Sequence, residues 1–193
     1  VESPGAQAPF MASFPLYTDG PDALSWVIGA DTLIRELVIE ASDDAGAPQF
    51  SEVEVEGRGA VIEVTSSGQG NISIGPADGD DVALFGFGNN PLYYQEHAGE
   101  LKFDLYIDSA ATDLDGTLRV KMESGFPALG FKDFQMAALP TDQWFTLSVK
   151  LNDLLENGGR RRLDTTRLTK LLVLEPTTNA RLRVDNVELA CGH

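Results

Sequence analysis

The sequence of 193 residues has a single cysteine, Cys191, and only two histidines, His97 and His193. One cysteine cannot form an intramolecular disulfide, and thiol chemistry would need a base that the tail does not obviously supply. Two histidines, one of them terminal, argue against a catalytic histidine triad and against a histidine-based metal site. The sequence therefore gives no support to thiol or histidine chemistry.

Basic residues are also few. The sequence has 14 Lys and Arg and 30 Asp and Glu, which gives a formal net charge of −16. An acidic field of this size repels phosphate backbones and anionic lipid head groups. We therefore expect no nucleic-acid partner. Negative charge maintains solubility, and such acidity is common among secreted proteins.

Long apolar runs are absent, and no segment approaches the ~20 residues of a membrane span. The first residues, VESPGAQAPF, lack the cationic start and apolar centre of a signal peptide and are rich in Pro, Ala and Gly. We expect residues 1–12 to be a linker or flexible N-terminus and residues 13–193 to form one domain. We also expect an extracellular or periplasmic location.

Apolar and polar residues alternate with a period of two along much of the chain, as a strand with one buried face requires. Such strands are expected at 52–56, 60–65, 71–74, 82–87, 101–108, 117–123, 144–151 and 181–189. The first two flank Gly57-Arg58-Gly59, which predicts a hairpin. Many short strands without regular strand–helix alternation predict an all-β fold, an antiparallel β-sandwich of the jelly-roll kind.

Helical signals are few. A short helix is expected at 151–158, with Asn152 as candidate N-cap and Gly158 at its end. The segment 32–39 fits either a strand or a helix.

The apolar phase changes within the last expected strand. Leu182 and Val184 occupy even positions, whereas Val187 and Leu189 occupy odd ones. A β-bulge at Asp185-Asn186 would account for the change. Bulges re-aim side chains, so Asp185 is a candidate for a role other than packing.

Three segments together carry a family resemblance: 101–107, 117–127, which ends in Ser124-Gly125-Phe126-Pro127, and 139–151. With Trp26-Val27-Ile28-Gly29 and the closing residues 184–187, they resemble the galactose-binding-like C-terminal domain of family 3 exo-β-glucanases, and jelly-roll carbohydrate-binding modules more broadly. The resemblance covers about positions 14 to 189 and departs from the family at residues 128–130. It implies a noncatalytic domain that sits beside the catalytic domains of a glycoside hydrolase.

Sugar-binding proteins stack aromatic side chains on the apolar face of a pyranose ring and use polar groups for its hydroxyls. Trp26, Tyr93, Tyr94 and Phe126 lie in or beside expected loops and are therefore ligand-binding candidates. Trp144 falls out of phase with the apolar positions of its strand, and we assign it to covering a sheet edge.

The remaining ligand-binding candidates are outward-facing residues of two strands: Tyr106, Arg119, Lys121 and Glu123. They share one strip if these two strands pair, and Arg181 and Arg183 would then extend it. A strip of this kind fits a polysaccharide groove, a surface that docks on a catalytic domain, or an ordinary hydrated sheet face.

An independent enzyme is the third hypothesis for the chain. Glycoside hydrolysis needs two carboxylates across the scissile bond. Among 30 acids a chance pair such as Asp104 and Asp108 carries little weight, because nothing in the sequence marks a raised pKa. We therefore assign no catalytic residue.

The one candidate cofactor is a structural calcium ion, and no other cofactor is indicated by the sequence. The segment 113–116 alternates carboxylates and ends in glycine, but it lacks the downstream glutamate of an EF-hand loop. The jelly-roll modules that this chain resembles often hold a structural calcium ion at their closing strand. The resemblance thus makes Asp185 the candidate metal ligand.

These observations predict a noncatalytic carbohydrate-binding or accessory module of a secreted glycoside hydrolase. The expected partners are a polysaccharide or oligosaccharide, with β-glucan favoured, and the catalytic domain of the parent enzyme. The alternative is a structural or docking domain that stabilises a catalytic domain without binding sugar by itself.

Overall fold

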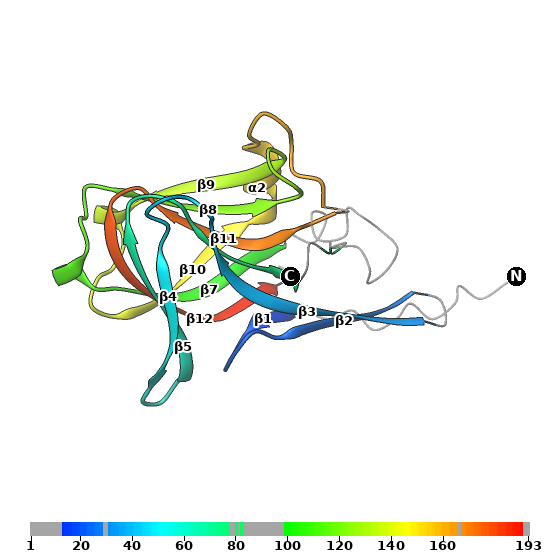
Figure 1. The fold of residues 1–193 in the computed structure, drawn as a ribbon, viewed down its shortest axis with the longest axis horizontal. Coiled ribbons are helices and arrows are strands. Elements are labelled where there is room, and N and C mark those ends of the chain that lie inside the picture. The colour runs from blue at the N-terminus through cyan, green and yellow to red at the C-terminus, as the bar shows by residue number, and fades with distance from the viewer. Residues whose placement is uncertain are drawn as a thin grey trace, which may run out of the picture.

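A computed structural model describes residues 13–28, 31–77, 80, 82, 99–165 and 167–190, and for residues 13, 24–28 and 31–33 it describes the backbone only. These residues form an all-β sandwich of two antiparallel sheets, as the alternation predicted (Figure 1). The expected linker at 1–12 lies outside them. No helix within the described segments is long and apolar enough to cross a membrane.

The first sheet contains β1 (Ser13–Tyr17), β4 (Gln49–Val55), β5 (Gly59–Ser67), β7 (Glu100–Ile107), β10 (Trp144–Lys150) and β12 (Asn179–Ala190). Its order is β10-β7-β12-β5-β4, and β1 pairs with the last part of β12. Strand β5 pairs with β12 only as far as the Ile62–Val184 pair, and beyond it β1 takes the place beside β12. The β4–β5 hairpin tip therefore leaves the sheet.

The second sheet contains β2 (Ala23–Ile28), β3 (Asp31–Ala41), β6 (Ile72–Pro76), β8 (Thr117–Glu123), β9 (Leu129–Gln135) and β11 (Lys170–Pro176). Its order is β2-β3-β6-β11-β8-β9. Between the strands lie one short helix, α2 (Leu151–Glu156), and two 3-10 turns, η2 (Ser109–Ala111) and η3 (Met136–Ala138).

Most of the expected strands are confirmed, and the ambiguous segment 32–39 is a strand, β3. Of the expected strand at 82–87 the structure describes only Val82, which makes an isolated bridge with Leu168. The expected helix is confirmed as α2, but the Asn152 cap is wrong. The helix begins at Leu151, and its N-cap residue is Lys150, whose side chain makes no capping hydrogen bond. Asn152 therefore lies inside the first turn.

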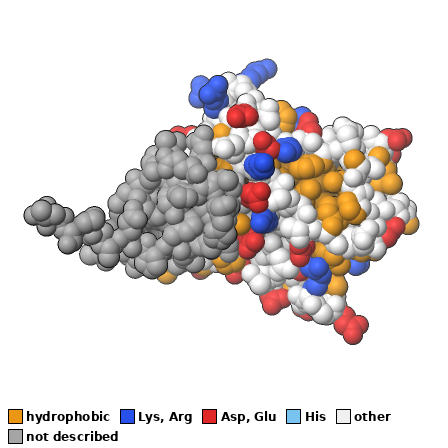
Figure 2. Space-filling view, turned by 180° about the vertical axis from the view of Figure 1, so that it is seen from behind, with side chains coloured by type: hydrophobic (Ala, Val, Ile, Leu, Met, Phe, Trp, Pro, Cys, Tyr) orange, Lys and Arg blue, Asp and Glu red, His pale blue; other side chains and the backbone are white. Residues whose placement is uncertain are grey.

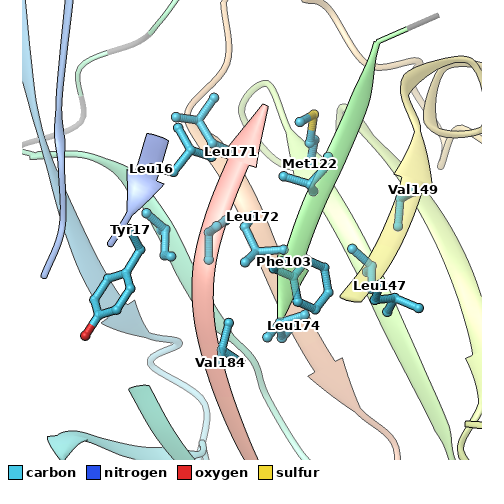
Figure 3. Packing of buried hydrophobic residues seen from close by; sticks show 14 of the residues in the cluster. Leu16, Tyr17, Phe103, Met122, Leu147, Val149, Leu171, Leu172, Leu174 and Val184 are labelled. Atoms are coloured by element: carbon cyan, nitrogen blue, oxygen red, sulfur yellow. The ribbon is translucent and has the colours of Figure 1, made fainter. Parts of the chain in front are cut away.

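The core lies between the sheets. Strand β7 alternates half-buried and fully buried residues along its length, so Leu101, Phe103 and Leu105 all point inward. Leu172 and Leu174 of the second sheet pack from the other side (Figure 3). Burying large apolar side chains of this kind contributes about 1.5–3 kcal/mol each. The opposite face of β7 is left for polar and aromatic side chains.

The predicted β-bulge is confirmed. Asp185 pairs with Asp104, and Glu188 pairs with Lys102. Between these two pairs β12 has one more residue than β7. Asn186 takes the left-handed backbone conformation, with φ of 47°. Its backbone N–H donates to Asp185 Oδ1 at 2.8 Å, which closes the bulge locally.

Candidate functional site

Four strands of the first sheet align one row of side chains on its outer face. Trp144 on β10 pairs with Tyr106 on β7, Tyr106 with Arg183 on β12, and Arg183 with Glu63 on β5. We call these four residues the Trp144 row. Neighbouring strands lie about 4.8 Å apart, so the row extends over about 14 Å.

The side chains of the Trp144 row contact one another in sequence. The Trp144 and Tyr106 ring centres are 5.7 Å apart at an interplanar angle of 55°. The guanidinium carbon of Arg183 lies 5.7 Å from the Tyr106 ring centre, and Arg183 Nε donates to Glu63 at 2.9 Å. Both rings are only half-buried. The row thus offers aromatic surface and hydrogen-bonding groups side by side.

Arg181 extends the charged end of the row. Its Nη2 donates to Glu63 Oε1 at 3.1 Å, so two guanidinium groups share one carboxylate. Hydrogen bonds from Arg183 and Arg181 lower the pKa of Glu63. Glu63 therefore stays ionised and orients both arginines. Arg181 and Arg183 therefore lie on the same outer face as Tyr106.

Beside the Trp144 row lies a second row, formed by Thr146, Asp104 and Asp185. Arg58 reaches it from the β4–β5 turn, and its Nη1 donates to Asp104 and to Asp185 at 2.9 Å each. The same guanidinium lies 4.0 Å from the Trp144 ring centre. Arg58 thus joins the two rows.

The two carboxylates of this second row differ in exposure. The side chain of Asp185 is 1% exposed and that of Asp104 is 20% exposed. Burial alone would raise the pKa of Asp104, but hydrogen bonds from Asn186, Arg58 and Thr146 outweigh burial and lower it. A glycosidase general acid needs a raised pKa, so Asp104 does not suit that role.

Four of the predicted ligand-binding residues need a correction in their grouping. Strand β7 pairs with β10 and β12, whereas β8 pairs with β9 and β11. The two strands therefore do not pair, and they belong to different sheets. Tyr106 lies on the outer face of the first sheet, and the candidates on β8 lie in the second: Arg119, Lys121 and Glu123.

The β8 candidates have their charges neutralised by neighbours. Arg119 donates to both oxygens of Asp133 at 2.7 and 2.9 Å, and its guanidinium carbon lies 4.2 Å from the Phe131 ring centre. Lys121 Nζ lies 2.6 Å from Glu175 and 3.5 Å from Glu123. These residues form a separate patch on the opposite side of the sandwich.

The loop candidates are placed only in part. Phe126 lies between β8 and β9 and is 79% exposed. The backbone of Trp26 pairs with Leu33 in the β2–β3 hairpin, but its side chain lies outside the described parts of the structure, as do Tyr93 and Tyr94 altogether. Their assignment to ligand binding stays a prediction.

Calcium at Asp185 does not fit the residues present. Calcium takes six to eight oxygen ligands. Arg58 Nη1 stands between the carboxylates of Asp104 and Asp185, and a cation at this place would meet the guanidinium charge. Among the described residues no group of three or more His, Cys, Asp or Glu side chains could hold a metal ion.

Sequence reasoning missed the two residues that organise this site. Arg58 was counted only as a turn residue, and Trp144 only as an edge cover. The even spacing of Trp144 with Thr146 and Ser148 was a signal that it faces outward. No local signal pointed from Arg58 to the distant Trp144.

On the face shown in Figure 2, hydrophobic side chains lie among interspersed basic and acidic ones.

No protein-family model matches the chain, and no curated protein matches it either. Solved structures share its fold. The family 30 carbohydrate-binding module of the cellulosomal cellulase CEL9D-CEL44B of Clostridium thermocellum superposes with a TM-score of 0.58 at 14% identity, covering 94% of this chain and 98% of that chain.

A second similar structure is a larger enzyme. The exo-1,3/1,4-β-glucanase of a Pseudoalteromonas species matches 100% of this chain with 22% of its own, at a TM-score of 0.58 and 15% identity. The extra C-terminal domain of that glucanase, solved separately, matches with a TM-score of 0.56 at 14% identity, over 93% of this chain and 92% of that domain. The resemblance and the β-sandwich fold are confirmed.

Proposed function

We propose that this chain is a noncatalytic carbohydrate-binding module of a secreted or periplasmic glycoside hydrolase, and that it binds β-glucan through the Trp144 row. The observation that carries the proposal is the alignment of Trp144, Tyr106, Arg183 and Glu63 across four strands. Two half-exposed rings supply apolar surface for pyranose rings, and the guanidinium and carboxylate groups beside them supply partners for hydroxyls.

The fold supports this proposal. The sandwich resembles a carbohydrate-binding module of a cellulase and the extra domain of an exo-1,3/1,4-β-glucanase. β-Glucan is the polymer suggested by the second of these proteins. The lowered pKa of both Asp104 and Glu63 supports binding rather than bond cleavage, since neither carboxyl is held protonated.

Affinity electrophoresis and calorimetry with soluble mixed-linked β-glucan, laminarin, xylan and galactomannan test the proposal. Replacing Trp144 or Tyr106 by alanine should weaken β-glucan binding about fivefold or more, because a ring that stacks on sugar contributes on the order of 1–3 kcal/mol. Phe131→Ala is the matched control, since Phe131 also lies against an arginine but in the other sheet. It should leave binding unchanged.

A specific observation favours the alternative, a docking domain that does not bind sugar by itself. Arg58 lies over the Trp144 ring, and the charges of the row are paired within the chain. If the wild-type chain binds none of the glycans, the docking function is supported and sugar binding is refuted. Hydrolysis of the same glycans by the purified chain would refute both.

A further inference from the structure

The loop between α2 and β11, in orange at the top of Figure 1, is fixed to the edge of the second sheet. Phe131 N–H donates to Asn157 O at 3.1 Å, Gly159 N–H to Leu129 O at 3.2 Å, and Leu129 N–H to Arg161 O at 3.3 Å. The loop thus covers the free edge of β9, which would otherwise expose unpaired backbone groups. Its side chains are presented from an ordered backbone.

This loop carries three consecutive arginines: Arg160, Arg161 and Arg162. All three are exposed, and basic side chains project from this end of the molecule in Figure 2. None of the three forms an ion pair with another described residue. By contrast, many basic residues elsewhere have carboxylate partners: Arg58, Lys102, Arg119, Lys121, Lys132, Lys170, Arg181 and Arg183.

An exposed aromatic ring accompanies the arginines. Ala128 makes an isolated bridge with Arg161, and Leu129 N–H donates to Arg161 O, so the turn that carries Phe126 ends beside the arginine run. A Cβ at Gly159 would lie 3.5 Å from Pro127 O, which places Phe126 next to the start of the arginine run. Phe126 is 79% exposed, the largest value among the exposed large hydrophobic residues described.

We propose that Phe126 and Arg160 to Arg162 form a second binding surface, for a carboxylated polysaccharide. Guanidinium groups match carboxylates through paired hydrogen bonds, and an aromatic ring takes the CH face of a sugar. A uronate chain offers both groups on every residue, whereas an acidic polypeptide offers only carboxylates. The surface is separate from the Trp144 row, which lies on the first sheet, and does not depend on it.

The acidity of the chain sets the conditions under which this surface acts. A net charge of −16 repels an anionic polymer at long range. At an ionic strength of about 0.1 M the Debye length is about 10 Å, so distant carboxylates are screened while adjacent guanidinium groups act in direct contact. Binding should therefore be short-ranged and should tolerate moderate salt.

The test uses affinity electrophoresis of the full chain at about 0.1 M NaCl, with polygalacturonate, neutral dextran and polyglutamate as probes. Polygalacturonate should retard the wild-type chain, and the other two should not. The variant R160Q/R161Q/R162Q should bind polygalacturonate roughly tenfold more weakly, and Phe126→Ala roughly threefold more weakly. The matched control K102Q/K150Q/K170Q removes three positive charges from other strands and should bind like the wild type.

A further variant, R160K/R161K/R162K, keeps the three positive charges but replaces the planar guanidinium groups, which bind a carboxylate through two hydrogen bonds. It should bind polygalacturonate more weakly than the wild type. The proposal is overturned if polygalacturonate fails to retard the wild-type chain, or if the lysine control loses as much affinity as the arginine variant. Equal retardation by polyglutamate would also overturn it, because the sugar ring would then contribute nothing. Circular dichroism of each variant establishes that the fold is retained.

Discussion

The guanidinium carbon of Arg58 lies 4.0 Å from the centre of the Trp144 ring, although the two residues belong to opposite ends of the first sheet. Arg58 crosses the outer face over β12 and β7, and on the way it donates to Asp185 and Asp104. One arginine therefore anchors the β4–β5 hairpin and covers part of the Trp144 ring.

The first prediction concerns this cover. Arg58→Ala should expose Trp144, since no other described cation lies over its ring. In a Trp26→Phe background, where Trp144 is the only tryptophan left of two, acrylamide quenching should increase. If the Trp144 row binds β-glucan, affinity should rise about two- to fivefold, because the sugar no longer has to displace a cation–π contact. Unchanged quenching would show that Arg58 does not cover the ring in solution.

The second prediction concerns stability. Arg58→Ala leaves the carboxylate of Asp185, whose side chain is 1% exposed, without its cation. Losing one partner of a buried pair costs about 3 kcal/mol, which urea unfolding can measure. The control is Arg119→Ala, which breaks a pair whose side chains are 36% exposed on each side. An exposed pair contributes about 0–1 kcal/mol, so equal losses in the two variants would contradict the prediction.

The fold was predictable because alternation is a local signal. In β7 every second residue is fully buried, and the sequence shows that pattern directly. The bulge was predictable for the same reason, since the apolar phase changes between Val184 and Val187. The strand order was not predictable, because which strands pair depends on contacts between distant segments.

The candidate site shows this limit clearly. Tyr106 and Arg183 were expected on one surface, and they pair directly. Arg119 was expected beside them on the assumption that consecutive strands pair, but the chain crosses from one sheet to the other between β7 and β8. The role of Arg58 depends on a hairpin tip that leaves its sheet, and nothing in the local sequence specifies where such a tip will rest.

The third prediction concerns the bulge residue Asn186, which has φ of 47°. Asn186→Val should lower the free energy of unfolding by about 1–3 kcal/mol, because a β-branched residue is strained in the left-handed region. Asn186→Gly relieves the backbone and loses the amide contacts to Asp104 and Asp185, so it should cost less than Asn186→Val. Urea unfolding compares the two, and the reverse order would contradict the assigned backbone conformation.

The fourth prediction concerns pH. Hydrogen bonds outweigh burial and lower the pKa of Asp104 below its ordinary value of 3.8. The folded state therefore binds fewer protons than the unfolded state at acidic pH. This contribution to stability is complete above about pH 5 and is lost as the pH falls through the folded-state pKa. Asp104→Asn should be less stable at neutral pH and should lose less stability on acidification, as urea unfolding from about pH 6 to pH 2.5 would show.

The last prediction concerns calcium. In the wild-type chain Arg58 Nη1 already occupies the place between Asp104 and Asp185, so millimolar CaCl2 and EDTA should give the same Tm. In Arg58→Ala the two carboxylates face each other without a cation, and Thr146 Oγ1 lies beside Asp104. Oxygen donors in such an arrangement suit calcium, which should then raise the Tm of the variant and restore part of its stability. A Tm increase with calcium in the wild-type chain would contradict this prediction. It would show that calcium binds at Asp185 and displaces the Arg58 guanidinium.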